Sequence, residues 1–152
     1  RRWEATGDSR TRRAAAKKRG TSSRLHGSVQ NAAALPSAPG TVDAVVSANA
    51  LHMLQEPDKV MAEIRRVLKP GGWLFAPTFV HGGGRLAGFR TWCMERTGFH
   101  VYHPWNAGEF LSYLSRQDFW VVEHALLGKR TLPLCYAACR WTPRGISPHK
   151  IW

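Results

Sequence analysis

The middle of the chain alternates between short apolar runs and one amphipathic stretch. Residues 42–50 (VDAVVSANA) are a nearly continuous run of small apolar side chains, which is typical of a strand buried on both faces of a parallel sheet. Residues 56–70 repeat apolar positions at the spacing of one helix face, and residues 73–80 (WLFAPTFV) form a second apolar run. Strand, helix and strand joined by short loops predict a right-handed parallel crossover unit.

The predicted helix at 56–70 has recognisable ends. Pro57 suits its first turn, where a missing N–H costs nothing, and Asp58 suits the positive end of the helix dipole. Its apolar stripe is formed by Val60, Ile64, Val67 and Leu68. The basic residues near its end, Lys69 included, suit the negative end of the dipole, and Pro70 with the two following glycines predicts a tight turn.

Residues 106–117 (NAGEFLSYLSRQ) have the pattern of a second helix. Asn106 and Glu109 are spaced as a capping box, in which each side chain bonds the backbone N–H of the other residue. The apolar side is formed by Phe110, Leu111 and Leu114. Two apolar runs follow at 119–128 and 132–141, and their short link predicts an antiparallel pair at the sheet edge. These patterns together predict an α/β fold.

The remaining segments are patterned more weakly. Residues 1–22 are interpreted as a basic segment that is disordered or aberrant, and residues 23–31 alternate enough for a short strand. Residues 86–105 are rich in aromatic side chains and are expected to be partly helical. The tail at 142–152 is polar and interrupted by proline, so we expect the folded domain to extend over residues 23–141.

Positive charge is concentrated at the N-terminal end. The net charge is +12, and residues 1–24 contribute nine Lys or Arg against Glu4 and Asp8. Such an arm can bind phosphates without sequence preference, but a solvated end is the plainer interpretation because only Trp3 interleaves with the charges, and no specific nucleic acid is expected. No apolar run approaches the ~20 residues of a membrane span. The sequence has no recognisable leader and begins with Arg1, so we expect it to start inside a longer gene product.

The three cysteines, Cys93, Cys135 and Cys139, form no CxxC pair. On a strand, the last two would share one face because they are four residues apart. We expect buried, unreactive thiols, no metal site and a reducing, cytoplasmic location.

The motifs between residues 35 and 80 resemble one known family. LP at 35–36, VDAVV at 42–46, ALHML followed by EP, and EIRRVLKPGG occur in the order and at the spacing of class I S-adenosylmethionine-dependent methyltransferases. The branch that includes the ubiquinone and menaquinone C-methyltransferases is the most similar, and the resemblance extends to about Trp141. It implies a Rossmann-like methyltransferase sheet, incomplete here and mostly parallel with an antiparallel C-terminal edge hairpin. It also implies S-adenosylmethionine as cofactor and a small-molecule methyl acceptor.

The resemblance also assigns expected cofactor contacts. Asn31 stands where the family has a side chain near the adenine amino group, although an Asx turn would explain it equally well. Asp8 would bind the ribose hydroxyls, but it is a weak candidate because of its basic neighbours. The expected cofactor-binding residues are therefore Asn31, Ala32, Ser47, Ala48, Asn49 and Asp8.

Three histidines are candidates for catalysis. His52 follows the strand that walls the cofactor in the family, and the resemblance implies that either Asn49 or His52 faces the transferred methyl group, although a structural histidine is the plainer interpretation of His52. His81 and His103 could line an acceptor pocket with neighbouring aromatic residues, or simply pack in the core. The sequence demands no dedicated base, because methyl transfer depends mainly on alignment of the reacting atoms.

The family's first strand and its glycine-rich loop, D-x-G-x-G-x-G, are absent from the 152 residues. That loop lets backbone approach the cofactor, so we expect impaired binding and activity. The absence also predicts an open edge on the strand at 42–50, which a second copy or a partner chain could complete. The alternative is a non-catalytic, truncated relative whose basic arm binds nucleic acid or acidic partners.

Overall fold

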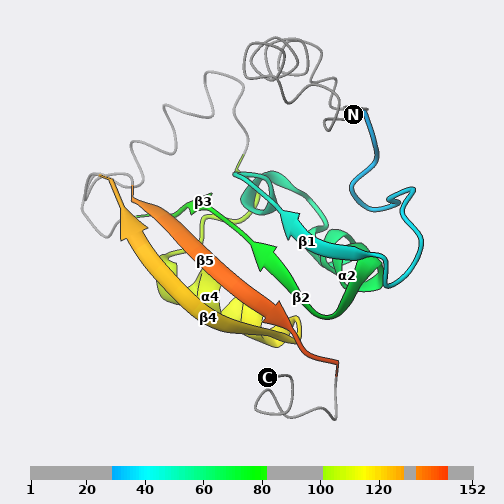
Figure 1. Cartoon of the computed structure of the whole chain (residues 1–152). Coiled ribbons are helices and arrows are strands. Elements are labelled where there is room, and N and C mark those ends of the chain that lie inside the picture. Colours follow the sequence, from blue (N-terminus) through cyan, green and yellow to red (C-terminus); the bar gives the residue numbers. More distant parts are fainter. Residues whose placement is uncertain (1–28, 82–100, 129–132, 144–152) are drawn as a thin grey trace, which may run out of the picture. The chain divides into compact units, whose positions relative to one another are not determined.

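The computed structural model describes residues 29–81, 101–128 and 133–143. The chain divides into two units, Arg1–Pro36 and Ser37–Trp152. In the first unit only residues 29–36 are described, and they form turns without helix or strand. All described helices and strands belong to the second unit (Figure 1). Among the described residues no helix is long and apolar enough for a membrane span.

The second unit contains a mixed sheet. Its strands are β1 (Val42–Val46), β2 (Leu68–Phe75), β3 (Thr78–Phe79), β4 (Phe119–Leu127) and β5 (Leu134–Trp141). Their order is β1-β2-β5-β3, and β4 pairs with β5.

The predicted crossover is confirmed, because β1 and β2 lie side by side and parallel. The sheet is mixed: β5 runs antiparallel to β2, β3 and β4, so these three strands and β1 point the same way. This agrees with the expected mostly parallel sheet that has an antiparallel C-terminal hairpin. The predicted C-terminal hairpin, β4 with β5, does form. However, β5 lies inside the sheet and only β4 lies at its edge, because β5 also pairs with β2.

Helix α2 (Pro57–Val67) has the predicted start and a shorter end. Pro57 occupies the first turn, and the apolar stripe is buried. The helix ends before Leu68, whose extended backbone (φ −68°, ψ 140°) begins β2 at once. Lys69 therefore does not serve the helix dipole as expected, and its Nζ lies 2.6 Å from Oδ1 of Asp43 in β1.

The predicted proline–glycine turn lies inside β2 as a bulge. Val42 pairs with Leu68 and Ala44 with Trp73, so four residues of β2 lie between these pairs where β1 has one. Gly71 has φ +76°, which favours glycine. A Cβ on Gly72 would lie 2.8 Å from the carbonyl oxygen of Lys69. The two glycines therefore accommodate the bulge that follows the direct junction of helix and strand.

The strand predicted at 73–80 is interrupted at Ala76 and Pro77. The N–H of Ala76 donates to the carbonyl of Ala137 in β5, whereas Pro77 has no N–H to donate. The two residues after Pro77 form β3, which pairs only with β5.

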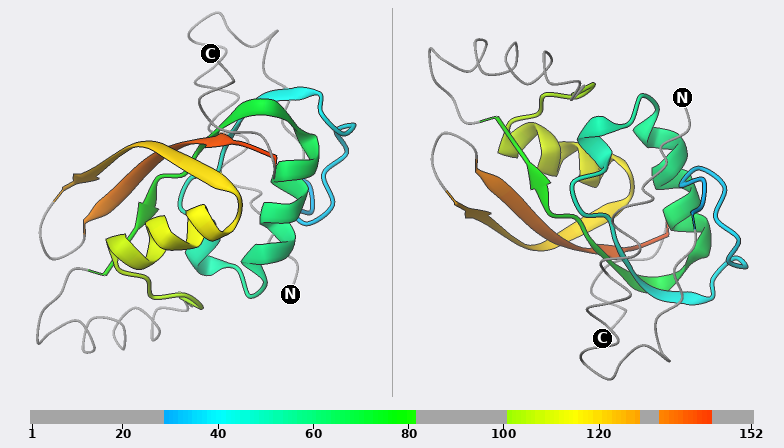
Figure 2. Two further views of the ribbon diagram at one scale, coloured as in Figure 1. Left: turned by 90° about the horizontal axis from the view of Figure 1, so that it is seen from below. Right: turned by 90° about the horizontal axis from the view of Figure 1, so that it is seen from above.

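Both described helices cover the same face of the sheet, as the two views of Figure 2 show for α2 and α4 (Ala107–Arg116). The capping box of α4 is present, with both predicted hydrogen bonds between Asn106 and Glu109. Phe110 and Leu114 are buried as predicted, but Leu111 is only half-buried and Tyr113 is buried instead. Buried side chains on these helices and on the covered face include Ile64, Leu74, Phe110, Leu114 and Cys139.

No described helix covers the opposite face, which carries Trp73 and Phe75 of β2 and Arg140 of β5. The Arg140 guanidinium lies 4.1 Å from the centre of the Trp73 ring, and its Nη1 donates to the Gly71 carbonyl. The burial predicted for residues 42–50 is wrong. Strand β1 is shorter, none of its residues is buried, and Val46 is 68% exposed. The reason is that β1 ends the described sheet and its outward face meets no described element.

Helices α2 and α4 are joined by polar contacts. The Tyr113 hydroxyl donates to Oδ1 of Asp58 (2.9 Å), and the Gln117 side-chain amide donates to the same oxygen (2.8 Å). The Arg65 guanidinium in turn donates to both the backbone carbonyl and Oε1 of Gln117.

Several sequence-based predictions fall outside the described residues. They include the basic segment at 1–22, most of the strand predicted at 23–31, residues 86–100 of the segment expected to be partly helical, Cys93 and the tail beyond residue 143. Residues 29–31 are described and are not strand.

Candidate functional site

The carboxyl end of β1 continues along β2 before the chain turns away. The N–H of Ser47 donates to the Phe75 carbonyl (2.9 Å), and the N–H of Asn49 donates to the Pro77 carbonyl (2.8 Å). Ser47 is buried, whereas Ala48 is exposed. Asn49 has φ +51°, a left-handed conformation that asparagine adopts more readily than most residues. This turn leads into the short 3-10 helix η2 (Leu51–Met53).

The three predicted histidines are brought together at this end of the sheet. The backbone carbonyl of His52, in η2, accepts from the N–H groups of Tyr102 and His103, both at 3.1 Å. The N–H of His81, just after β3, donates to the Trp105 carbonyl at 2.9 Å. Residues 101–105 are thus held against η2 on one side and the end of β3 on the other. We call this arrangement the histidine junction: Asn49, η2, Thr78, His81 and residues 101–105.

His52 is 5% exposed. Burial, with a further contribution from the charge of His81, lowers the pKa of His52 below its ordinary value. The imidazole is therefore neutral near pH 7, and one of its ring nitrogens can accept a hydrogen bond. A neutral, buried histidine can therefore hydrogen-bond a polar ligand without solvent competing for the same nitrogen.

Stacked aromatic rings connect the junction to α4. His103 stacks on Trp105 at 5.0 Å between ring centres, and Trp105 stacks on Tyr113 at 4.7 Å. An open hollow of about 710 Å³ lies beside these rings and is lined by His103, Trp105, Asn106, Glu109, Ser112 and Arg116, among others. This hollow brings solvent up to His103.

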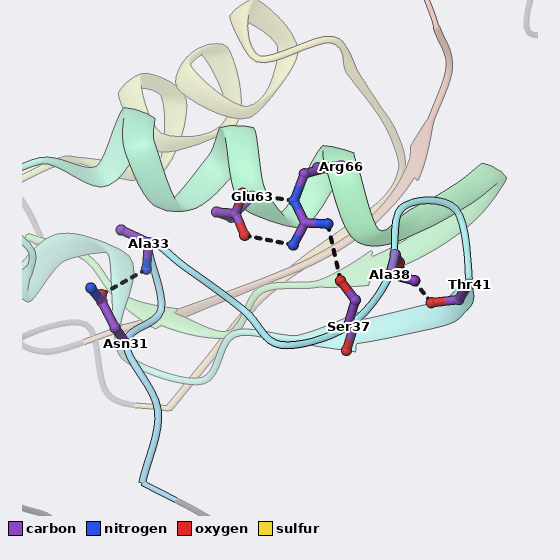
Figure 3. A network of polar contacts seen from close by, with 7 residues as sticks. All are labelled: Asn31, Ala33, Ser37, Ala38, Thr41, Glu63 and Arg66. Carbon is purple, nitrogen blue, oxygen red and sulfur yellow. Dashed lines mark hydrogen bonds and ion pairs between the residues drawn. The ribbon is translucent and has the colours of Figure 1, made fainter.

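The loops before β1 contain the other described candidates. In the first unit, the N–H of Ala33 donates to Oδ1 of Asn31 (3.0 Å), so Asn31 forms an Asx turn (Figure 3). In the second unit, Arg66 binds the Glu63 carboxylate and donates to the Ser37 carbonyl (3.0 Å), which fixes the loop that enters β1.

Comparison with known proteins gives consistent results. The family model described as a methyltransferase domain matches residues 6–76. An uncharacterized chloroplastic methyltransferase of Arabidopsis thaliana is 40% identical over 75 residues, which are 46% of this chain and 21% of the relative. The chain thus spans about a fifth of that relative.

Solved structures share the fold. Geranyl diphosphate methyltransferase in complex with SAM has a TM-score of 0.70 at 12% identity, over 91% of this chain and 66% of that one. The 4+2 cyclase SpnF has a TM-score of 0.67 at 21% identity, over 85% of this chain and 61% of that one.

The chain is thus similar to S-adenosylmethionine-dependent methyltransferases in residues 6–76 and shares their fold. The sequence motifs that resemble this family lie on β1, α2 and β2, and the predicted Rossmann-like α/β class is correct.

The described residues fit S-adenosylmethionine in part. Ala48 presents a small, exposed side chain at the carboxyl end of β1, and the left-handed Asn49 turns the chain away from it. In the first unit, Oδ1 of Asn31 accepts from the N–H of Ala33, and an amide oxygen can accept a second hydrogen bond. Ala32 is exposed beside it, whereas Asp8 lies outside the described residues.

One residue of the histidine junction was missed by sequence reasoning. Thr78 is fully buried, and its side chain belongs to a short strand that the sequence pattern merged with β2. A threonine directly after a proline within an apolar run was the available signal.

Proposed function

We propose that this chain carries a site for S-adenosylmethionine-dependent methylation of a small molecule, and that its affinity for the cofactor is low. The observation that supports the proposal is the histidine junction at the carboxyl end of β1, within a chain that is similar to methyltransferases. In open α/β sheets, ligands bind outside the carboxyl ends of the strands. The low affinity is proposed because the 152 residues contain no D-x-G-x-G-x-G loop.

S-adenosylmethionine would supply an electrophilic methyl group. In the proposed site of the second unit, Ser47, Ala48 and Asn49 wall its methionine portion. For Asn31 and Ala32, in the first unit, the resemblance alone supports a contact with adenine. His52, buried and neutral, faces the acceptor, and His81 and His103 line the acceptor side. These residues act mainly by orientation and by keeping water from the reacting atoms.

The test is a titration with S-adenosylhomocysteine, followed by NMR of the backbone amides. We expect a saturable shift of the Ala48 amide with a dissociation constant of about 1 mM, equivalent to about −4 kcal/mol. The variant Ala48→Leu should abolish the shift, whereas Ala62→Leu, at an exposed position of α2, should not. Micromolar binding would contradict the proposed impairment, and no shift at all would contradict the site.

Two further proposals concern the surroundings of the site. A second copy or a partner chain would complete the sheet at β1, because this strand is exposed at the end of the described sheet. A reducing, cytoplasmic compartment is supported by the two buried free thiols, Cys135 and Cys139.

The nucleic-acid alternative gains no support from the described part of the chain. That part contains six Lys or Arg residues and seven Asp or Glu residues, so the positive excess lies in segments outside it.

A further inference from the structure

Buried polar atoms without hydrogen-bond partners gather at the histidine junction. Within the described part of the chain, Asn49 Oδ1, His52 Nδ1, Thr78 Oγ1 and His103 Nε2 are all in this state. Thr78 is fully buried and His52 nearly so. Each belongs to a different segment: the end of β1, η2, β3 and the loop at 101–105.

Main-chain hydrogen bonds hold these four segments together. Asn49 donates to Pro77, the residue before Thr78, and the carbonyl of His52 accepts from His103. The four residues therefore lie on segments that are bonded to one another at one end of the sheet.

An unsatisfied buried polar atom costs about 1–3 kcal/mol, and native proteins keep few of them. Four at one junction is a concentration that packing does not explain. A bound group that offers complementary hydrogen bonds would offset the cost, as it does in binding sites whose polar groups are positioned in advance.

The chemistry of the four atoms restricts what they can bind. Oδ1 of Asn49 only accepts hydrogen bonds, so the ligand must offer an O–H or N–H to it. The nitrogens of His52 and His103 and the Thr78 hydroxyl can complete the set. None of the residues in the junction is Lys, Arg, Asp or Glu, so it offers no counter-charge to a carboxylate, phosphate or ammonium group.

We propose that the histidine junction binds the methyl acceptor, and that this acceptor is a neutral molecule presenting a hydroxyl or amine hydrogen to Asn49 and His52. The inference rests on the proposed function and adds the chemical class of the substrate. It favours oxygen or nitrogen over carbon as the atom held in the site. The stacked rings of His103 and Trp105 border the region and suit a flat ring on the ligand.

Phenol and anisole test this proposal, because they share a ring and differ in the donor hydroxyl. The full chain, with ¹⁵N-labelled histidine, is titrated with each compound near neutral pH, and the ring-nitrogen resonances are assigned with His52→Gln and His103→Gln. We expect phenol to shift the His52 and His103 nitrogens in a saturable way and anisole to leave them unchanged. Equal responses to both compounds, or no response to phenol, would overturn the proposal.

A matched pair of variants at Asn49 gives the second measurement. Asn49→Gly removes Oδ1 and tolerates the left-handed backbone, whereas Asn49→Asp retains an acceptor oxygen. We expect the glycine variant to weaken phenol binding about three- to tenfold, the loss of one hydrogen bond, and the aspartate variant to keep it. Unchanged affinity in Asn49→Gly would refute the role of this oxygen.

The titration with S-adenosylhomocysteine separates the two proposals. Cofactor-product binding at Ala48 without a phenol response would leave the proposed function standing and remove the acceptor assignment. A phenol response without any binding of S-adenosylhomocysteine would retain a binding site for hydroxyl compounds and remove the methyltransferase role.

Discussion

At the scale of single residues, Tyr113 links the two described helices through one hydroxyl. Its ring is buried against Trp105, and its hydroxyl donates to Asp58 of α2. Burial and this hydrogen bond raise the pKa of Tyr113 well above its ordinary value. The tyrosine is therefore a neutral donor to a carboxylate, which is a strong type of hydrogen bond.

Replacing this tyrosine tests the link. Tyr113→Phe keeps the ring and removes the donor, so we expect the free energy of unfolding to fall by about 1–2 kcal/mol. Urea unfolding followed by circular dichroism measures the change. Tyr136→Phe, on β5, is the control and should change stability by less than about 0.5 kcal/mol. An equal effect of the two variants would show that the Asp58 contact does not stabilise the fold.

The buried His52 makes the free energy of unfolding depend on pH in mildly acidic solution. The pKa of His52 is lowered in the folded protein, whereas in the unfolded chain it is about 6.5. As the pH falls below about 6.5, the unfolded chain binds this proton before the folded chain does, so the free energy of unfolding decreases. Above that pH the imidazole is neutral in both states and contributes no pH dependence.

The measurement is urea unfolding at a series of pH values for the unaltered chain and His52→Gln. We expect the variant to lose less stability than the unaltered chain on acidification below about pH 6.5, and the two curves to run parallel above it. Parallel curves at every pH would contradict a lowered pKa.

At the scale of elements, the bulge in β2 is the feature that depends most on residue size. The space beside Gly72 is bounded by backbone atoms: the carbonyl oxygens of Lys69 and Asp43 would lie 2.8 and 3.2 Å from an added Cβ. Backbone cannot move aside as a flexible side chain can. The bulge is also the point at which α2 passes directly into the sheet.

Gly72→Ala should therefore destabilise the fold by about 1–3 kcal/mol, as overpacking does. Gly108→Ala, in the first turn of α4, is the matched control, because its Cβ would lie 3.4 Å from the nearest atom and alanine favours a helix. Thermal unfolding of both variants measures the difference. If Gly72→Ala is as stable as Gly108→Ala, the close approach in the bulge is not a constraint.

Elements with strong periodicity could be predicted from the sequence, and their partners could not. The stripe of Val60, Ile64 and Val67 gave α2, and the spacing of Asn106 and Glu109 gave the start of α4. Periodicity says nothing about neighbours, so the internal position of β5 and the exposure of β1 were missed. An apolar run looks the same whether or not a second layer covers it.

The same limit applies to the candidate site. The resemblance placed His52, His81 and His103 as candidates, and the structure shows that backbone hydrogen bonds bring them together. Thr78 was missed because Pro77 isolates it in a two-residue strand, which is too short to show a pattern. Which polar atoms are left unpaired depends on tertiary contacts, and no local sequence rule reports them.

At the scale of the whole molecule, the uncovered face and β1 expose apolar surface. Val46 of β1 is 68% exposed, and it pairs with Phe75 on the face that no described helix covers. Exposed strands of this kind favour association with another chain. Val46→Lys places a charge on this surface and should abolish any such association.

Size-exclusion chromatography with light scattering tests this at increasing protein concentration. We expect the unaltered chain to increase in mean mass and Val46→Lys to remain monomeric. Val29→Lys, at an exposed valine outside the sheet, is the control and should behave like the unaltered chain. A monomer at every concentration would contradict self-association at this face.

The strand order has a consequence for synthesis on the ribosome. β5 pairs with β2, β3 and β4, yet it is the last described strand to be translated. Until Trp141 leaves the exit tunnel, the earlier strands lack their shared neighbour, and only the β1–β2 pair can form. A nascent chain stopped before residue 134 would thus keep β3 and β4 unpaired, and chaperones are expected to hold this protein until β5 has been translated.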